Sequence, residues 1–323
     1  MRLRNIVSWT FLVGLIGGMY LVVANAQDIR DWYALRGYEP PARVVQLADK
    51  TTMTPDTRRV FYVNHPQISD KRDFRAHCEI KEQSIVLGCY ISNRGIFVLE
   101  VEDKRLDGVV EVTAAHEVLH AAYDRLSSSE KTRVDKMTNS FFKTIKDQRI
   151  LDTVENYRKK DASVVPNELH SILATEVKEL PADLEEYYGQ YFADRQQIVE
   201  FSQQYEQAFI RLENKVESID GQLDSLKNQI ESNKASFNQK EAELNQRRTE
   251  LDRLLANNQV DEYNAKVGEF NELVGSYNRL INSTKQLVSR YNQLVEERNS
   301  LVTAEQELKD AIDSSSIPSE KAR

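Results

Sequence analysis

The fold and the chemistry of this chain are decided by one stretch, Thr113-Ala114-Ala115-His116-Glu117-Val118-Leu119-His120-Ala121-Ala122. His116 and His120 are four residues apart, so on a helix both imidazoles leave the same face and can bind one Zn²⁺. Glu117 is rotated away from that pair but stays close to the open position of such a metal, where a water would sit. It can therefore act as the base that takes the water's proton.

The residues that flank the two histidines are uncharged and mostly small, which indicates a helix packed on nearly every side. An ordinary amphipathic helix that carries the pattern by chance is the alternative. The stretch resembles the zincin metallopeptidases, whose wider pattern is met here by Thr113, Val118, Leu119 and Ala122. The resemblance implies an α+β zincin-like domain, with a small antiparallel or mixed sheet plus active-site helices. It also implies a zinc endopeptidase with Glu117 as general base.

A catalytic zinc needs three protein ligands and one open position, so a third ligand must lie elsewhere in the chain. In the segment 165–176, Asn167 after Pro166 is typical of a helix N-cap, and the apolar residues that follow predict a packed face. The Asn167-Glu168 pair, with the small Ser171 three positions later, resembles the second metal-binding helix of the gluzincin branch. We therefore expect Glu168 to be the third ligand.

Two other side chains of this segment stay open as the third ligand, Glu176 and then His170. Each candidate also has a simpler interpretation: Glu168 as a favourable charge at a helix N-terminus, Glu176 as a surface carboxylate and His170 as a packing residue. No histidine follows shortly after the motif, which disfavours the metzincin branch. Sites of this kind often use a tyrosine to stabilise the oxyanion. The sequence does not choose among the candidates Tyr123, Tyr157, Tyr187, Tyr188 and Tyr191.

The first 26 residues predict a signal peptide or an N-terminal membrane anchor. Arg2 and Arg4 precede an uncharged stretch from Ile6 to Val23, and small residues end the segment at 24–26. At ~1.5 Å per residue this stretch is just long enough to cross a bilayer core, so we favour a retained anchor over a cleaved signal. Both interpretations leave the arginines in the cytoplasm. The bulk of the chain is then extracytoplasmic, on a single-pass membrane protein or, after cleavage, a secreted one.

The two cysteines, Cys78 and Cys89, suit that compartment. In an oxidising environment such a pair forms a disulfide, which stabilises the fold by about 2–3 kcal/mol. Their spacing is not that of a zinc knuckle, and no second pair exists.

Three runs rich in β-branched and aromatic residues predict strands, at 59–63, 84–91 and 95–101. The third precedes the motif helix, which we expect at about 109–126. The zincin resemblance implies that this strand forms the sheet edge along which a substrate peptide lies. Ser127 and Glu130 form a capping-box pattern that starts the next helix.

From Arg195 onward apolar residues recur every seven positions, as in a coiled coil. The first arm carries Val216, Leu223, Ile230, Phe237, Leu244 and Leu251, while Asn233, Lys240 and Arg247 interrupt its second register. A turn is expected near 256–261, followed by an arm with a wider apolar face. We expect an all-α antiparallel hairpin that can also self-associate or bind a protein partner.

The predicted organisation is a signal peptide or anchor at 1–26, a linker at 27–57 with one helix near 42–48, a zincin-like metallopeptidase domain at 58–195, a coiled-coil hairpin at 196–313 and a disordered tail at 314–323. The net charge is −8, and no basic stripe is present, so nucleic acid is not expected as a partner. A peptide or protein substrate is expected. The alternative is a catalytically inactive envelope scaffold whose coiled coil binds a partner, and a weaker one is a metal-stabilised binding domain.

Overall fold

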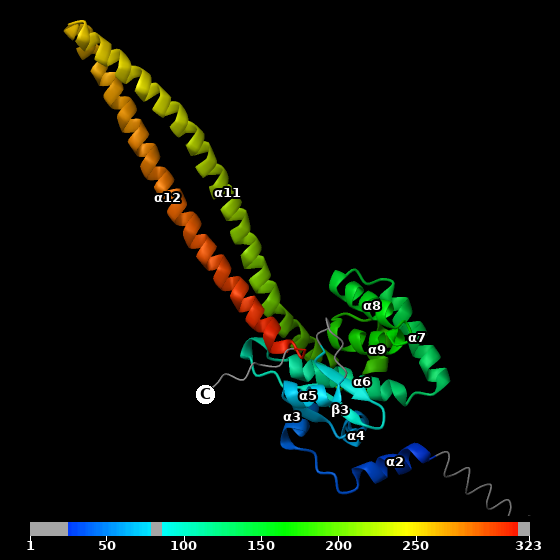
Figure 1. Cartoon of the computed structure of the whole chain (residues 1–323). Coiled ribbons are helices and arrows are strands. Elements are labelled where there is room, and N and C mark those ends of the chain that lie inside the picture. The colour runs from blue at the N-terminus through cyan, green and yellow to red at the C-terminus, as the bar shows by residue number, and fades with distance from the viewer. Residues whose placement is uncertain (1–24, 79–85, 316–323) are drawn as a thin grey trace, which may run out of the picture. The chain divides into compact units, whose positions relative to one another are not determined.

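A computed structural model of the chain describes residues 25–78 and 86–315 (Figure 1). Two compact units are present, Met1–Ala208 together with Leu308–Arg323, and Phe209–Glu307. The expected signal peptide or anchor lies outside the described residues, apart from its last two positions. Within the described ranges, no helix has the length and apolar character needed to cross a membrane.

The described part of the chain is mostly helical and contains a small mixed sheet, which agrees with an α+β unit followed by two long helices. In chain order its elements are α2 (Ala26–Leu35), α3 (Ala42–Lys50), α4 (Pro55–Val63), β1 (Gln67–Ser69), α5 (Lys71–His77), β2 (Gly88–Ile91), β3 (Gly95–Leu99), η1 (Lys104–Leu106), α6 (Val109–Asp124), α7 (Ser128–Phe142), α8 (Gln148–Lys160), α9 (Val165–Glu176), α10 (Ala182–Tyr188), α11 (Arg195–Ala256) and α12 (Val260–Ile312).

The sheet has the order β1-β3-β2, with β3 parallel to β1 and antiparallel to β2. The strand predicted at 95–101 is therefore present as β3, but it lies in the centre of the sheet, and the prediction that it forms the edge is wrong. Every residue of β3 is buried, as a strand paired on both sides requires. The edge strand beside the motif helix is β2, where Gly88 lies against Thr113 and Glu117 of α6.

The strand predicted at 59–63 is wrong, because these residues form the second half of α4. Thr54 caps this helix by accepting a hydrogen bond from the Thr57 N–H at 3.3 Å, and Pro55 occupies its first turn. Thr57 and Phe61, one helical turn apart, are both buried. The cap and the helical spacing of the buried side chains outweigh the strand preference of the Val-Phe-Tyr-Val run.

The segment expected as a linker, 27–57, instead contains α2, α3 and the start of α4. The helix expected near 42–48 is confirmed as α3, and its residues Val44, Leu47 and Ala48 are buried at helical spacing. This part of the chain belongs to the core of the first unit.

The motif helix α6 starts where the backbone makes a sharp turn at Gly108, whose φ is +98°. A Cβ built there would lie 2.8 Å from the Phe201 carbonyl oxygen, so only glycine fits this position. From Val109 onward nearly every residue of α6 is buried, as the uncharged flanks of the motif predict. The next helix, α7, starts with the predicted capping box, in which Ser127 and Glu130 bond reciprocally.

Cys78 and Cys89 form the predicted disulfide, with their Cα atoms 6.0 Å apart. It joins the end of α5 to the edge strand β2. Around it lies a buried apolar cluster that includes Phe74, Phe97 and Leu99. The crosslink and the cluster together hold β2 in register beside β3.

The two long helices pair antiparallel across the second unit, as the heptad pattern predicts. Each polar residue that interrupts the second register contacts a polar residue of α12. Asn233 donates to the Thr284 hydroxyl at 2.9 Å, and Lys240 donates to the Ser276 hydroxyl at 3.0 Å. Arg247 forms an ion pair with Glu269 at 2.8 Å. Helix α11 starts at Arg195, next to the expected start of the hairpin at 196, and its residues up to Ala208 belong to the first compact unit.

The predicted disordered tail starts too early. Ser314 is fully buried, and the carbonyl oxygen of Ser315 accepts a hydrogen bond from Arg75 at 2.5 Å. The remainder of the predicted tail, 316–323, lies outside the described residues.

We expect Gly108→Ala to destabilise the first unit by about 1–3 kcal/mol, because the residue must adopt a left-handed conformation and its new Cβ meets the Phe201 backbone. Gly189→Ala is the matched control, since the φ of Gly189 is −58° and a Cβ there meets only backbone oxygens at 3.3 Å or more. Chemical denaturation of both variants measures the difference. Equal unfolding midpoints for the two would contradict this account of the α6 turn.

Candidate metal centre

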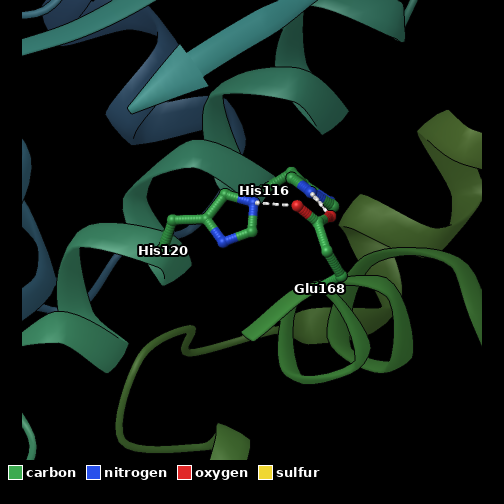
Figure 2. A group of neighbouring side chains, drawn as sticks. All are labelled: His116, His120 and Glu168. Atoms are coloured by element: carbon green, nitrogen blue, oxygen red, sulfur yellow. Dashed lines mark ion pairs between the residues drawn. The ribbon is translucent and has the colours of Figure 1, made fainter. Parts of the chain in front are cut away.

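The two histidines of the motif leave α6 on the same side and point toward α9, where they meet Glu168 (Figure 2). The His116 and His120 rings are nearly perpendicular, with centroids 4.7 Å apart. This is the one-turn spacing predicted from the sequence. Both side chains are partly accessible, although the helix around them is buried.

Glu168 lies in the first turn of α9, as expected, but the predicted cap of this helix is wrong. Val164 occupies the N-cap position, and Pro166 and Asn167 are already helical. The Glu168 N–H donates to the Val164 carbonyl oxygen at 3.0 Å, which closes the first turn. Proline suits this position because its missing N–H would have no partner there.

The donor atoms of the three side chains form one close group. His116 Nε2 lies 3.5 Å from Glu168 Oε2, and His120 Nε2 lies 3.7 Å from Glu168 Oε1. One ligand atom from each residue can be chosen so that all lie within 4.8 Å of one another. In a tetrahedral zinc site with bonds of about 2.1 Å, neighbouring donors are about 3.4 Å apart. The separations are therefore close to those that a bound Zn²⁺ would impose.

One oxygen of the Glu168 carboxylate is buried and unpaired. This atom, Oε2, has no hydrogen-bond partner, since the contact with His116 is too long for a well-formed bond. Burial raises the pKa of Glu168, but the two imidazoles and the Tyr157 hydroxyl outweigh that effect and hold the pKa below its ordinary value. A buried carboxylate that stays ionised needs a cation beside it.

A neighbouring hydroxyl orients the second histidine. Ser171 Oγ lies 3.4 Å from His120 Nδ1 and donates to the Asn167 carbonyl oxygen at 3.3 Å. With its own proton directed to Asn167, the hydroxyl accepts the Nδ1 proton of His120. Nε2 is then the unprotonated nitrogen, and it faces Glu168. Such outer contacts are how proteins fix the tautomer of a metal-binding imidazole.

Glu117 is buried beside the histidines and has only 5% of its surface exposed. Burial raises its pKa to about 7, and the Tyr90 backbone N–H stabilises the ionised form by a hydrogen bond. Gly88 permits this arrangement, because a Cβ there would lie 2.7 Å from Glu117 Oε1. A carboxylate that is held by a backbone donor and has a pKa near neutrality is suited to accept a proton.

A pocket of about 210 Å³ opens beside the motif. It is lined by Val86, Leu87, Gly88, Val112, Thr113, His116, Glu117, Tyr157, Glu176 and Tyr205. The edge strand, the motif helix and residues of α8, α9 and α11 thus all contribute to one cavity. Its position gives a ligand simultaneous access to His116 and Glu117.

The two alternative third ligands lie outside the donor group. Glu176 lines the pocket but pairs with Arg149 at 2.5 Å. His170 is completely buried, and its Nε2 lies 2.9 Å from the Tyr187 hydroxyl. Of the three candidates, only Glu168 lies within reach of both motif histidines.

Of the five tyrosines considered as oxyanion donors, Tyr157 is the one that lines the pocket. The Tyr123 hydroxyl donates to Asp135 at 2.8 Å, and the Tyr188 hydroxyl donates to the His170 carbonyl oxygen at 2.8 Å. Tyr187 and Tyr191 bond to each other at 3.0 Å. These four hydroxyls have partners away from the pocket.

The sequence reasoning missed Gly88, the Tyr90 backbone and Tyr205. Gly88 and Tyr90 lie in the run 84–91 that was predicted as a strand, but their approach to α6 depends on how the strands pair. Tyr205 lies at the start of a long helix that was assigned to the coiled coil. The one available signal was Gly88 itself, because a glycine inside a strand often marks the close approach of another group.

Comparison with known proteins gives no family for this chain: no family model matches it, and no similar curated protein or solved structure was found.

We expect Glu168→Gln to weaken zinc binding by more than about 100-fold, because even partners outside the ligand shell contribute 10–100-fold. Glu176→Gln removes a carboxylate from the same helix and the same pocket, but one that pairs with Arg149. It should bind zinc like the wild type. Titration with a competing chelator measures both affinities, and a larger loss in Glu176→Gln would overturn the assignment of Glu168.

Proposed function

We propose that this chain is a zinc-dependent endopeptidase with a zincin-like catalytic unit, anchored in a membrane by its N-terminal segment and acting outside the cytoplasm. The observation that carries the proposal is the Glu168 carboxylate, which lies between two imidazoles with one oxygen buried and unpartnered, while Glu117 lies next to them at a pocket. A histidine pair, a carboxylate and a neighbouring glutamate make up the donor set and the base of a catalytic zinc site.

The sheet supports a peptide as the substrate. Leu87 O accepts from the Leu99 N–H at 2.8 Å, so in this antiparallel register residues 87, 89 and 91 face β3. The N–H and C=O groups of residues 88 and 90 then point to the open edge, beside α6. The Tyr90 N–H binds Glu117, and the Gly88 groups are those that an extended peptide would pair with by strand addition.

In the proposed reaction His116, His120 and Glu168 hold the metal. When bound there, Zn²⁺ would supply Lewis acidity, which polarises a scissile carbonyl and lowers the pKa of a water. Glu117 accepts the proton of that water and then donates it to the amine of the leaving peptide, so protons balance over the cycle. We assign the contact with the carbonyl oxygen to the Tyr157 hydroxyl, because this tyrosine lines the pocket.

We expect Glu117→Gln to abolish hydrolysis while leaving zinc bound, since the amide keeps the shape of the side chain but cannot accept a proton. The loss in kcat should be about 100-fold or more. Cleavage of a peptide library and metal content of the same preparation measure the two effects. Hydrolysis at the wild-type rate would remove the enzyme proposal, and a zinc-bound wild type without any hydrolysis would favour the inactive scaffold.

Gly88→Ala tests the edge strand separately from the metal. The new Cβ would lie 2.6 Å from a Thr113 carbon and 2.7 Å from Glu117, so the base or the strand must shift. A displacement of about 1 Å at a reacting group can cost on the order of 100-fold in rate. We expect kcat/KM to fall by about that factor with zinc still bound. Unchanged kinetics would show that β2 and Glu117 are not positioned together.

A further inference from the structure

Helix α2 presents an apolar face to solvent. Ile29, Trp32 and Tyr33 are 49%, 62% and 75% exposed, and together with Arg36 they follow the i, i+3, i+4, i+7 spacing of one helical stripe. The Arg36 guanidinium lies over the Trp32 ring, 5.6 Å from its centroid. Contiguous exposed aromatic side chains on a helix commonly mark a contact surface.

The opposite face of α2 is fixed to the catalytic unit. Asp31 is only 3% exposed and receives two hydrogen bonds from Arg125, at 2.9 Å and 3.1 Å. Arg59 of α4 adds an ion pair at 3.3 Å. Arg125 directly follows the motif helix α6, so this buried pair locks the orientation of α2 to that of the metal-binding residues. Because the Asp31 side of α2 is held against the unit, the side that carries Trp32 and Tyr33 faces outward.

The order of the chain indicates what covers this face. The uncharged stretch Ile6–Val23 ends three positions before α2 begins at Ala26. Trp and Tyr are the side chains that concentrate at the interface between membrane and water, and an arginine beside them suits lipid headgroups. A helix that follows a membrane segment this closely and carries these residues on one side meets the conditions for an interfacial helix.

We propose that α2 lies flat on the outer surface of the bilayer, with Ile29, Trp32 and Tyr33 inserted at the boundary between headgroups and acyl chains. This rests on the membrane anchorage given under the proposed function. Through Asp31 and Arg125 the docked helix would fix the motif helix relative to the membrane. The pocket would then accept peptide segments that lie close to the bilayer in preference to distant ones.

The test uses the two tryptophans of the chain, Trp9 and Trp32. The full-length Trp9→Phe variant, in phosphatidylcholine vesicles with or without bromine on the upper acyl chain, reports on Trp32 alone. An interfacial helix buries its apolar face ~5–10 Å deep. We therefore expect the fluorescence of Trp32 to be blue-shifted and its intensity to fall about twofold with brominated lipid. An α2 that stood upright would place Trp32 about 14 Å beyond Val23, out of reach of the bromines.

Two controls separate the possible failures. Trp32→Phe leaves only Trp9, and quenching of Trp9 without quenching of Trp32 would keep the anchor but overturn the docking of α2. If neither is quenched, the anchorage and this inference both fail, whereas zinc binding and hydrolysis are unaffected.

Val164→Trp, made in a chain without the other two tryptophans, places the reporter at an exposed position before α9. Its emission should stay unquenched, and quenching equal to that of Trp32 would overturn a specific contact through α2.

Discussion

The arrangement of the first unit depends on one buried carboxylate oxygen. The Glu168 carboxylate lies between two imidazoles, and its Oε2 atom, on the His116 side, is buried without a hydrogen-bond partner. Leaving such an atom unpaired costs several kcal/mol, and a cation bound beside it would offset that penalty. This atom is buried because α6, which carries both histidines, packs directly against α9. The packing that buries this oxygen therefore also gathers the three candidate donor atoms within 4.8 Å of one another.

The edge strand is the second element on which the site depends. The Cys78–Cys89 disulfide anchors β2 to α5, β3 pairs with it, and Gly88 lets it approach α6 closely enough for the Tyr90 N–H to reach Glu117. The proposed base is thus positioned by backbone atoms of a crosslinked strand. Such a contact does not depend on the rotamer of a second side chain, so the strand fixes the position of the Glu117 carboxylate.

The sequence was informative where structure is local. The His116 and His120 spacing predicts their shared face because helical geometry is the same in every protein, and the Ser127 capping box is equally local. Glu168 was found by resemblance, and its approach to the histidines depends on the packing of α6 against α9. The prediction failed at 59–63, where a cap at Thr54 and Pro55 overrides strand preference, and at β3, whose central place depends on a β1 that was not foreseen. The place of Tyr205 in the pocket was also not predicted, since a heptad pattern says nothing about which other elements a helix contacts.

The hairpin of the second unit carries a consequence of its own. Three polar pairs, Asn233 with Thr284, Lys240 with Ser276 and Arg247 with Glu269, match each other at one alignment of α11 and α12. Sliding one arm by a heptad would separate all three pairs at once. The apolar stripe alone tolerates such slippage. The three pairs therefore favour the observed alignment of α11 and α12, to which the repeating apolar residues add no preference of their own.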